Sequence, residues 1–349
     1  MLQAYGLKKY LMDHGFDVTM IPYSNNNLEG RYRFLPKHIG YKYRKLFIGD
    51  YDIWEMLRNV KHFRTFVQKR SNMRAFRTKY LTKKRSISKL DKLNTDSFDV
   101  IIIGSDQVWN PELTLGLDDA YVGRFPLKEN GKVISYAASF GKETLEAKIG
   151  EELGACLDRY FAAVSLREKS SIEFLQQYTA KNLIHVPDPT LLNPAEVWKE
   201  IIRENKHKKF ADDKKGYIVY HGTEFNPNMI RYAELLEEKS GKIVRDVRKA
   251  PYGPAQFLDA MSEADYVVTN SFHGTVFSIL LERQFVVFAH SEKNARLKDL
   301  LESLGLSDRL AETHELETID RSIDWFEVKR NIIALRQNGE KFLSENLEE

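Results

Sequence analysis

Short apolar runs alternate along the chain with stretches in which apolar residues recur every three or four positions. A run almost free of polar residues is typical of a strand inside a parallel sheet covered on both faces, and the longer period predicts an amphipathic helix. The predicted strands are 99–104, 132–135, 161–166, 183–186, 217–220, 242–247, 265–269 and 285–288, and the predicted helices are 171–178, 228–239, 254–264, 275–282 and 297–304. This alternation favours a right-handed, doubly wound α/β architecture.

The length of the chain, 349 residues, is typical of two domains. A charged stretch at 193–215 lies near the middle of the alternation and marks the expected boundary. We therefore predict a Rossmann-like domain over 1–195, with a basic helical insertion at about 31–90, and a second Rossmann-like domain over 196–323. The amphipathic pattern of 324–349 predicts a C-terminal helix that can cross back onto the first domain.

The first residues predict a helix over 1–13 and a strand over 16–22. A parallel α/β sheet seldom opens with the helix of a βαβ unit whose first strand is missing. We therefore expect a further strand and polar loop upstream of Met1.

Composition excludes several classes of protein. With 42% hydrophobic and 30% charged residues, the chain is typical of globular proteins rather than disordered or low-complexity ones. Its most membrane-like run, 276–281, is far shorter than the ~20 apolar residues that a membrane span needs, and 1–16 lacks the apolar core of a signal peptide. One cysteine, Cys156, allows no intramolecular disulfide and is interpreted as a core residue. A cytoplasmic location fits these features best.

The charge of the chain is unevenly distributed. Between Arg31 and Arg85 there are 17 Lys and Arg but only three acids, although the net charge of the whole chain is +3. Apolar residues recur there at three and four residue intervals, which predicts an amphipathic helix whose apolar face is buried and whose outer face is cationic. Such a face suits nucleic acid, an anionic lipid surface or a phosphorylated substrate, and a solvated face with no partner is the alternative.

Candidate site residues follow the predicted strands, because ligands of open α/β sheets bind beyond the carboxyl ends of the strands. The turn 104–110 (GSDQVWN) places Asp106 after the first strand, where it can face a ligand or simply cap a helix. The turn 135–141 (SYAASFG) has small residues that allow either close approach of a ligand or tight packing.

Two further turns favour the binding of anions. Arg167 ends a predicted strand, and its planar guanidinium matches phosphate or carboxylate. The turn 269–275 (TNSFHGT) opens an apolar helix, whose unpaired backbone donors and positive dipole end attract an anion, and Gly274 there lacks a Cβ that would block one. His273 can exchange a proton near neutral pH. Neither metal-ligand spacing nor a dinucleotide-binding or P-loop motif is present, so no metal is predicted.

Taken together, five ordered segments resemble the polysaccharide pyruvyl transferase family: GSDQVWNP (104–111), SYAASFG (135–141), VSLREKSS (164–171), VPDPTLL (186–192) and TNSFHGTVFSI (269–279). The resemblance covers nearly the whole chain. It implies two Rossmann-like domains facing across a cleft, as in GT-B glycosyltransferases, and transfer of a pyruvyl group from phosphoenolpyruvate to a sugar as a ketal. Two features depart from the family pattern: relatives begin with a strand and an Asn/Gly-rich loop before the LQAYGL helix, and some carry an arginine where this chain has Ser271.

With the family's donor in view, the candidate residues take expected roles. Phosphoenolpyruvate is a co-substrate, so no bound cofactor is expected. We expect His273 to act as an acid or to hold the phosphate, and Asp106 to orient or deprotonate the acceptor hydroxyl. The expected donor-binding residues are Arg167, Ser271, His273, Gly274, Thr275 and Ser139, and the expected acceptor-binding residues are Asp106, Gln107 and Trp109.

Two alternatives remain open. A GT-B glycosyltransferase with a nucleotide-sugar donor shares the fold but should carry a ribose-binding carboxylate in the second domain, and no carboxylate follows the HG turn until Glu282. A nucleic-acid-binding protein would interleave aromatic residues on its cationic face. Here the aromatic residues are expected on the buried face instead, so no nucleic acid is expected. We instead expect residues 31–85 to guide the protein to an anionic membrane, at the inner face, or to a lipid-linked sugar acceptor.

Overall fold

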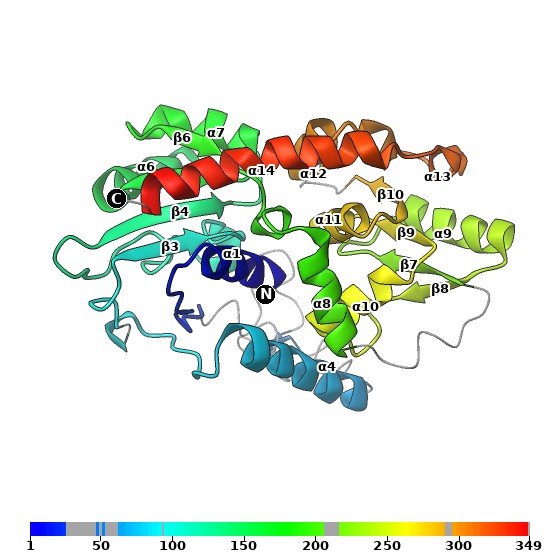
Figure 1. Ribbon diagram of the computed structural model, residues 1–349, viewed down its shortest axis with the longest axis horizontal. Coiled ribbons are helices and arrows are strands. Elements are labelled where there is room, and N and C mark those ends of the chain that lie inside the picture. Colours follow the sequence, from blue (N-terminus) through cyan, green and yellow to red (C-terminus); the bar gives the residue numbers. More distant parts are fainter. Residues whose placement is uncertain are drawn as a thin grey trace. The chain divides into compact units, whose positions relative to one another are not determined.

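The computed structural model describes residues 1–25, 47–48, 51–52, 62–92, 94–205, 216–289 and 295–347 (Figure 1). It divides into two compact units. Unit 1 comprises Met1–Tyr10, Val67–Tyr80 and Thr190–Gln337, and unit 2 comprises Leu11–Phe66, Leu81–Pro189 and Asn338–Glu349. Each unit contains one parallel sheet, which confirms the predicted α/β class.

The sheet of unit 2 has four strands in the order β3-β4-β5-β6. They are β3 (Val100–Gly104), β4 (Lys132–Ala138), β5 (Ala163–Leu166) and β6 (Leu183–His185). All pair in parallel, at the four places where apolar runs predict strands. The short helix α5 (Pro111–Thr114) follows β3.

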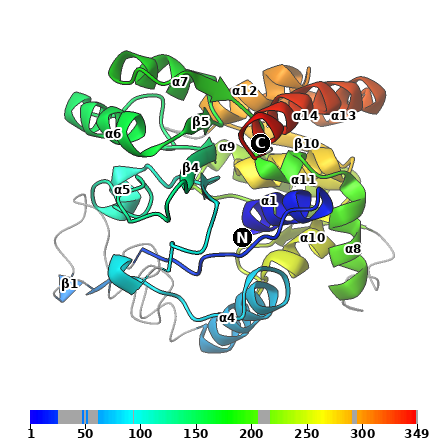
Figure 2. The ribbon, with the colours of Figure 1, turned by 60° about the vertical axis from the view of Figure 1, so that its left-hand side comes forward.

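One face of this sheet is covered by α6 (Ala147–Tyr160) and α7 (Lys169–Leu175), as Figures 1 and 2 show. Leu153 and Leu157 of α6 form one buried cluster with Val133 and Val164 of the strands. On the other face of the sheet, Tyr136 of β4 contacts Phe342, with ring centroids 6.3 Å apart. The strands are therefore buried on both faces, which explains their nearly continuous apolar sequence.

The sheet of unit 1 has five parallel strands in the order β8-β7-β9-β10-β11. They are β7 (Tyr217–His221), β8 (Ile243–Asp246), β9 (Tyr266–Thr269), β10 (Gln284–Phe288) and β11 (Leu310–Ala311). The chain moves outward from β7 to β8 and then returns across β7 to β9, so the strand order reverses between β7 and β9. This reversal is the topological switch point, where open α/β sheets bind their ligands.

Helices cover both faces of this sheet as well. On one face, Met229, Tyr232 and Leu236 of α9 (Pro227–Ser240) pack against Ile218 and other strand residues. On the other face, rings contact one another between α8, α10 and α11. These helices are α8 (Ala195–Asn205), α10 (Pro254–Ser262) and α11 (Phe272–Leu280), and the further helices are α12 (Ala295–Ser303), α13 (Glu317–Asp320) and α14 (Trp325–Leu347).

Two segments far from this sheet in sequence also belong to unit 1. Tyr5 of α1 (Leu2–Asp13) contacts the rings of Phe76, Tyr80 and Trp198. The helix α4 (Phe63–Phe76) continues into a π-helical turn over Arg77–Leu81. The remaining single turns are the 3₁₀ helices at Leu90–Lys92, Gln176–Tyr178, Pro189–Leu191 and Ser307–Arg309. None of the described helices is long and apolar enough to cross a membrane.

The strand predicted over 16–22 is wrong. This segment joins no sheet, and its neighbour Tyr23 forms only an isolated bridge with Ile87. Pro22 offers no backbone N–H for a ladder, and Ile21 contributes its side chain to the core of unit 2 instead. Alternating burial therefore arises here without strand pairing.

The basic insertion is helical only in part. The strands β1 (Phe47–Ile48) and β2 (Tyr51–Asp52) pair antiparallel within it, and α4 is its described helix. The expectation that its apolar side chains are buried is wrong for Phe63 and Val67, which are 54% and 47% exposed. Trp54, Leu57 and Val60, to which the same expectation applied, lie outside the described residues.

Gly154 of α6 permits the close approach of this helix to the turn at Tyr178. A Cβ on Gly154 would lie 2.0 Å from the backbone oxygen of Tyr178. Gly154→Ala is therefore expected to destabilise the protein by about 1–3 kcal/mol through overpacking, whereas helix propensity alone predicts a gain of about 0.5–1 kcal/mol. Urea unfolding measures the sign. Glu151→Ala, at an exposed position of α6, is the control, and a stabilised Gly154→Ala variant would contradict the packing.

Candidate functional site

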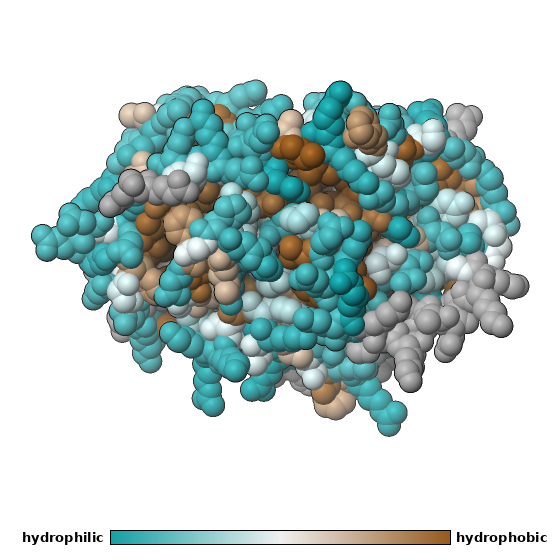
Figure 3. Space-filling view, in the orientation of Figure 1, coloured by the Kyte–Doolittle hydropathy of each residue, from teal (hydrophilic) through white to brown (hydrophobic). Residues whose placement is uncertain are grey.

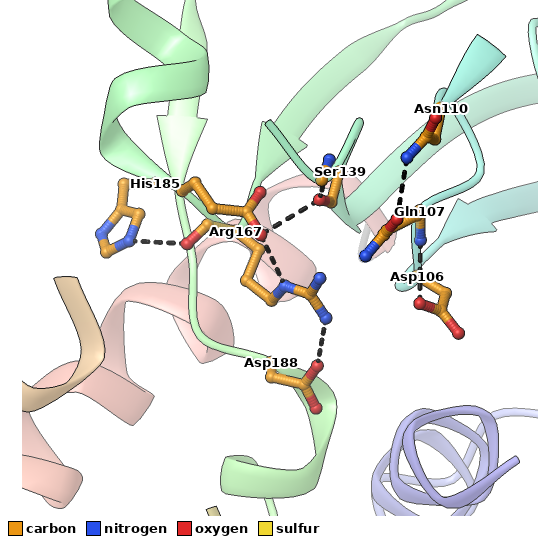
Figure 4. A network of polar contacts seen from close by, with 9 residues as sticks. Asp106, Gln107, Asn110, Ser139, Arg167, His185 and Asp188 are labelled. Carbon is orange, nitrogen blue, oxygen red and sulfur yellow. Dashed lines mark hydrogen bonds and ion pairs between the residues drawn. The ribbon is translucent and has the colours of Figure 1, made fainter. Parts of the chain in front are cut away.

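Arg167, at the end of β5, is buried between two carboxylates of unit 2. Its Nε atom lies 3.0 Å from Glu168 Oε1, and Nη1 lies 2.9 Å from Asp188 Oδ2. The three side chains are at most 3% exposed. Figure 4 shows the guanidinium directed toward Asp188. Arg167 is thus engaged by protein groups, and its predicted role in donor binding remains a prediction.

Glu168 extends this ion pair to the end of β4. Ser139 donates a hydrogen bond to Glu168 Oε1 (3.0 Å) and accepts one from the N–H of Gly141 (2.9 Å). Asp188 follows β6, so the cluster joins the carboxyl ends of three neighbouring strands. Charge-assisted hydrogen bonds in a buried setting are strong, and they hold these turns in a fixed relation.

The surroundings of Arg167 are acidic overall. Burial alone would lower the pKa of Arg167, but the attraction of Glu168, Asp188 and Asp106 outweighs it and raises the pKa above its usual range. Three carboxylates therefore act on one guanidinium. A further anion placed beside them would meet net repulsion.

The turn after β3 presents Asp106 to solvent. Asp106 Oδ1 accepts a hydrogen bond from the N–H of Gln107 (2.9 Å), and Gln107 Oε1 accepts one from Asn110 (2.8 Å). Trp109 is fully buried in the core, and its indole N–H donates to the carbonyl of Tyr121 (2.8 Å). Of the predicted acceptor-binding residues, Asp106 is the exposed one, and Trp109 supports the turn from below.

The unit 1 residues predicted from sequence lie at its switch point. Thr269 ends β9 and pairs in register with His221, which ends β7. The hydroxyl of Thr269 donates to the carbonyl of His221 (2.8 Å) and accepts from the N–H of Ser271 (3.0 Å). Asn270 accepts from the N–H of Thr223 (2.6 Å) and thereby connects the two strand ends again.

Ser271 begins α11 as its N-cap. Its hydroxyl accepts from the N–H of Gly274 (3.4 Å), while Thr275 donates its hydroxyl to the carbonyl of Ser271 (3.1 Å). Thr275 is fully buried and Ser271 is 7% exposed. Both predicted donor-binding hydroxyls are therefore engaged in forming the helix start, whose positive dipole end favours a bound anion.

The interpretation of Gly274 as space for an anion is wrong. A Cβ at this position would lie 2.3 Å from Thr269 Oγ1 and 3.0 Å from His221 Nδ1, so the space is filled by the protein's own atoms. Gly274 instead allows α11 to pack closely against the ends of β7 and β9. Its role is to hold the helix start beside His221.

Three residues of the two strand-end sites, Glu168, Asp188 and His221, were not predicted from the sequence. Glu168 and Asp188 stand in the segments VSLREKSS and VPDPTLL, but neither was given a role. His221 directly follows the predicted strand 217–220, so the rule that ligands bind beyond strand ends could have found it. Partners of a buried arginine cannot be chosen from sequence alone.

A family model for polysaccharide pyruvyl transferases matches residues 1–292, which include all five segments of the resemblance. The chain belongs to the polysaccharide pyruvyl transferase family. This family member is also 24% identical to general stress protein 30 of Bacillus subtilis (strain 168) over 177 residues, which are 46% of this chain and 48% of that protein. The chain thus matches about half the length of this relative.

Removal of Asp188 should lower the free energy of unfolding, because the buried guanidinium of Arg167 loses a partner. Asp188→Ala leaves Arg167 with one fewer partner, and breaking a buried pair typically costs about 3–5 kcal/mol. We expect a loss near the lower end of that range, because Glu168 remains. Urea unfolding is the measurement. Asp99→Ala, which breaks the exposed pair with Lys128, should leave the midpoint unchanged, and equal effects of the two variants would contradict the buried cluster.

Proposed function

We propose that this protein transfers a pyruvyl group from phosphoenolpyruvate to a sugar of a polysaccharide or of its lipid-linked precursor, forming a ketal. Family membership supports the class of reaction. The observation that carries the assignment of substrates is the contrast in charge between the two sites. Carboxylates surround the site of unit 2, whereas histidines and cations gather at the switch point of unit 1.

The donor is assigned to the switch point of unit 1. Phosphoenolpyruvate carries a phosphate and a carboxylate, and the start of α11 offers backbone donors and a positive dipole end for one of them. His273 lies in the first turn of this helix and acts on His221 electrostatically together with Arg248. These groups favour an anion, and His273 can also deliver a proton to the methylene carbon of the donor.

The acceptor is assigned to the strand ends of unit 2. Asp106 is exposed there and can accept the proton of a sugar hydroxyl. Arg167 pairs with Glu168 and Asp188, so we assign Arg167 a positioning role in place of the donor-binding role expected from the sequence. The facing, GT-B-like arrangement implied by the family resemblance is retained as part of this proposal.

The proton balance of the reaction fits this division of roles. One proton adds to the methylene carbon and makes it a methyl group, while the first sugar hydroxyl adds to the neighbouring carbon and loses its proton. The C–O bond to phosphate then breaks, and the second hydroxyl adds and loses its proton. Of the two hydroxyl protons, one balances the new methyl group and the other leaves with phosphate. An acid and a base at separate positions, such as His273 and Asp106, serve these steps.

Asp106→Asn separates the acceptor role from the donor role. Calorimetry is expected to show that the unchanged protein binds phosphoenolpyruvate in preference to a panel of nucleotide sugars. The Asp106→Asn variant should keep the dissociation constant for phosphoenolpyruvate, because Asp106 is assigned to the acceptor. Its rate of phosphate release with a panel of sugar acceptors should fall by ~10²–10⁴, the usual contribution of a general base.

Asp96→Asn, another exposed carboxylate of unit 2, serves as the matched control and should alter neither quantity. Tight binding of a nucleotide sugar without binding of phosphoenolpyruvate would overturn the proposal in favour of a GT-B glycosyltransferase. Loss of donor binding in Asp106→Asn alone would place the donor in unit 2.

We further propose that α4 associates peripherally with an anionic membrane at its inner face. The exposed side chains of Phe63, Val67, Arg70 and Arg74 follow one another at four, three and four residue intervals, which places them on one stripe of the helix. Such a stripe suits a helix that lies in the lipid interface, with its apolar side chains among the headgroups. Most of the face seen in Figure 3 is hydrophilic. Phe63 and Val67 are among the few large apolar side chains that are about half exposed.

Association with vesicles should depend on this stripe and on salt. We expect the protein to bind vesicles that contain phosphatidylserine and not vesicles of phosphatidylcholine alone. Binding should weaken as the ionic strength rises past the physiological value, at which the Debye length is ~8 Å. Arg70→Glu with Arg74→Glu should abolish it. Arg330→Glu with Lys341→Glu, at exposed positions of α14, is the control and should leave vesicle binding intact. Sedimentation that is equal at low and high salt, or absent, would remove the hypothesis.

A further inference from the structure

His221 is a switch-point residue with an unusual environment. It ends β7 beside the start of α11, and its ring packs against Phe257 of α10, with centroids 5.0 Å apart. The Nδ1 atom is enclosed, faces the close approach at Gly274 and has no hydrogen-bond partner in the described part of the chain. Among the described residues, no hydrogen bond is made by Nε2 either, and this atom is not among the enclosed ones. The ring is therefore packed on the side of Nδ1, and Nε2 is the ring nitrogen that is not fully enclosed.

Charged groups of β8, α11 and α4 act on this ring, whereas α10 and β9 contribute the uncharged Phe257 and Thr269. Arg248 follows β8, His273 belongs to α11 and Lys69 belongs to α4, and these three oppose a positive charge on His221. Asp246 of β8 is the opposing acid. The site is thus short of negative charge, and Lys69 brings one cation of the basic segment to it.

We propose that His221 binds the phosphate group of phosphoenolpyruvate through Nε2 and takes up a proton as it does so. The inference rests on the proposed function and adds to it a donor-binding residue from β7. Arg248 and Lys69 provide the surrounding positive potential, and the start of α11 provides backbone donors for the same group.

Electrostatics explains why the proton arrives with the ligand. Burial, followed by the repulsion of Arg248 and His273, lowers the pKa of His221 to about 4, so the ring is neutral in the free protein at neutral pH. A phosphate dianion at hydrogen-bond distance favours the charged imidazolium and raises this pKa. Because the complex then holds more protons than its separate components, the contribution of His221 to donor affinity increases as the pH falls toward the free value.

Histidine ring resonances test this directly in the unchanged protein. The chain has nine histidines, and comparison with His221→Gln assigns the resonance of His221. In the free protein this resonance should not titrate between pH 5.5 and 8, a range well above the free pKa of about 4. Saturation with phosphoenolpyruvate or inorganic phosphate should bring its titration into that range, and saturation with pyruvate should not.

Donor affinity provides a second test. His221→Gln should raise the dissociation constant for phosphoenolpyruvate at least tenfold, whereas His314→Gln, at an exposed position of unit 1, should not change it. Melting temperatures show whether either variant is damaged, and the titration of the unchanged protein stands independently of both.

The possible failures are distinguishable. A protein that does not bind phosphoenolpyruvate at all contradicts the proposed function itself. Normal binding with a silent His221 resonance overturns this inference alone, and a response to pyruvate but not to phosphate overturns the assignment of His221 to the phosphate group.

Discussion

All strands of the two larger sheets run parallel, and this constraint determines where chemistry can occur in each unit. Parallel pairing places every strand-to-helix turn of one unit at the same edge of its sheet. Residues distant in sequence therefore meet within hydrogen-bond distance: Ser139 bonds to Glu168, and Arg167 bonds to Asp188. The same constraint brings His221 beside Thr269 in unit 1.

The two strand-end sites differ in how they use charge. In unit 2 the buried guanidinium of Arg167 is paired with Glu168 and Asp188, so two of its nitrogens are engaged by protein groups before any ligand arrives. Such an arrangement fixes loop geometry more readily than it recruits an anion. In unit 1 the partly exposed histidines are accompanied by cations with less acid nearby, an environment that favours an anion. This difference is the physical basis for assigning the donor to unit 1 and the acceptor to unit 2.

The sequence predicted the repeating elements well, because buried parallel strands and amphipathic helices have distinct periods. It was less informative where one pattern serves two structures. Residues 16–22 have the burial of a strand without the pairing, and Gly274 suggests space for a ligand but lies against Thr269 and His221. Phe63 and Val67 continue the apolar period of their segment, but their side chains are exposed to solvent. Of the two carboxylates paired with Arg167, Glu168 is its neighbour in sequence, but Asp188 lies 21 residues away, and no local pattern encodes that contact.

The most direct test of this account is a crystal structure of the protein with phosphoenolpyruvate bound. We predict that the phosphate lies at the start of α11, within hydrogen-bond distance of His221 or His273, and that the pair between Arg167 and Asp188 is retained. A phosphate bound by Arg167, with Asp188 displaced from it, would contradict the central claim that unit 1 holds the donor.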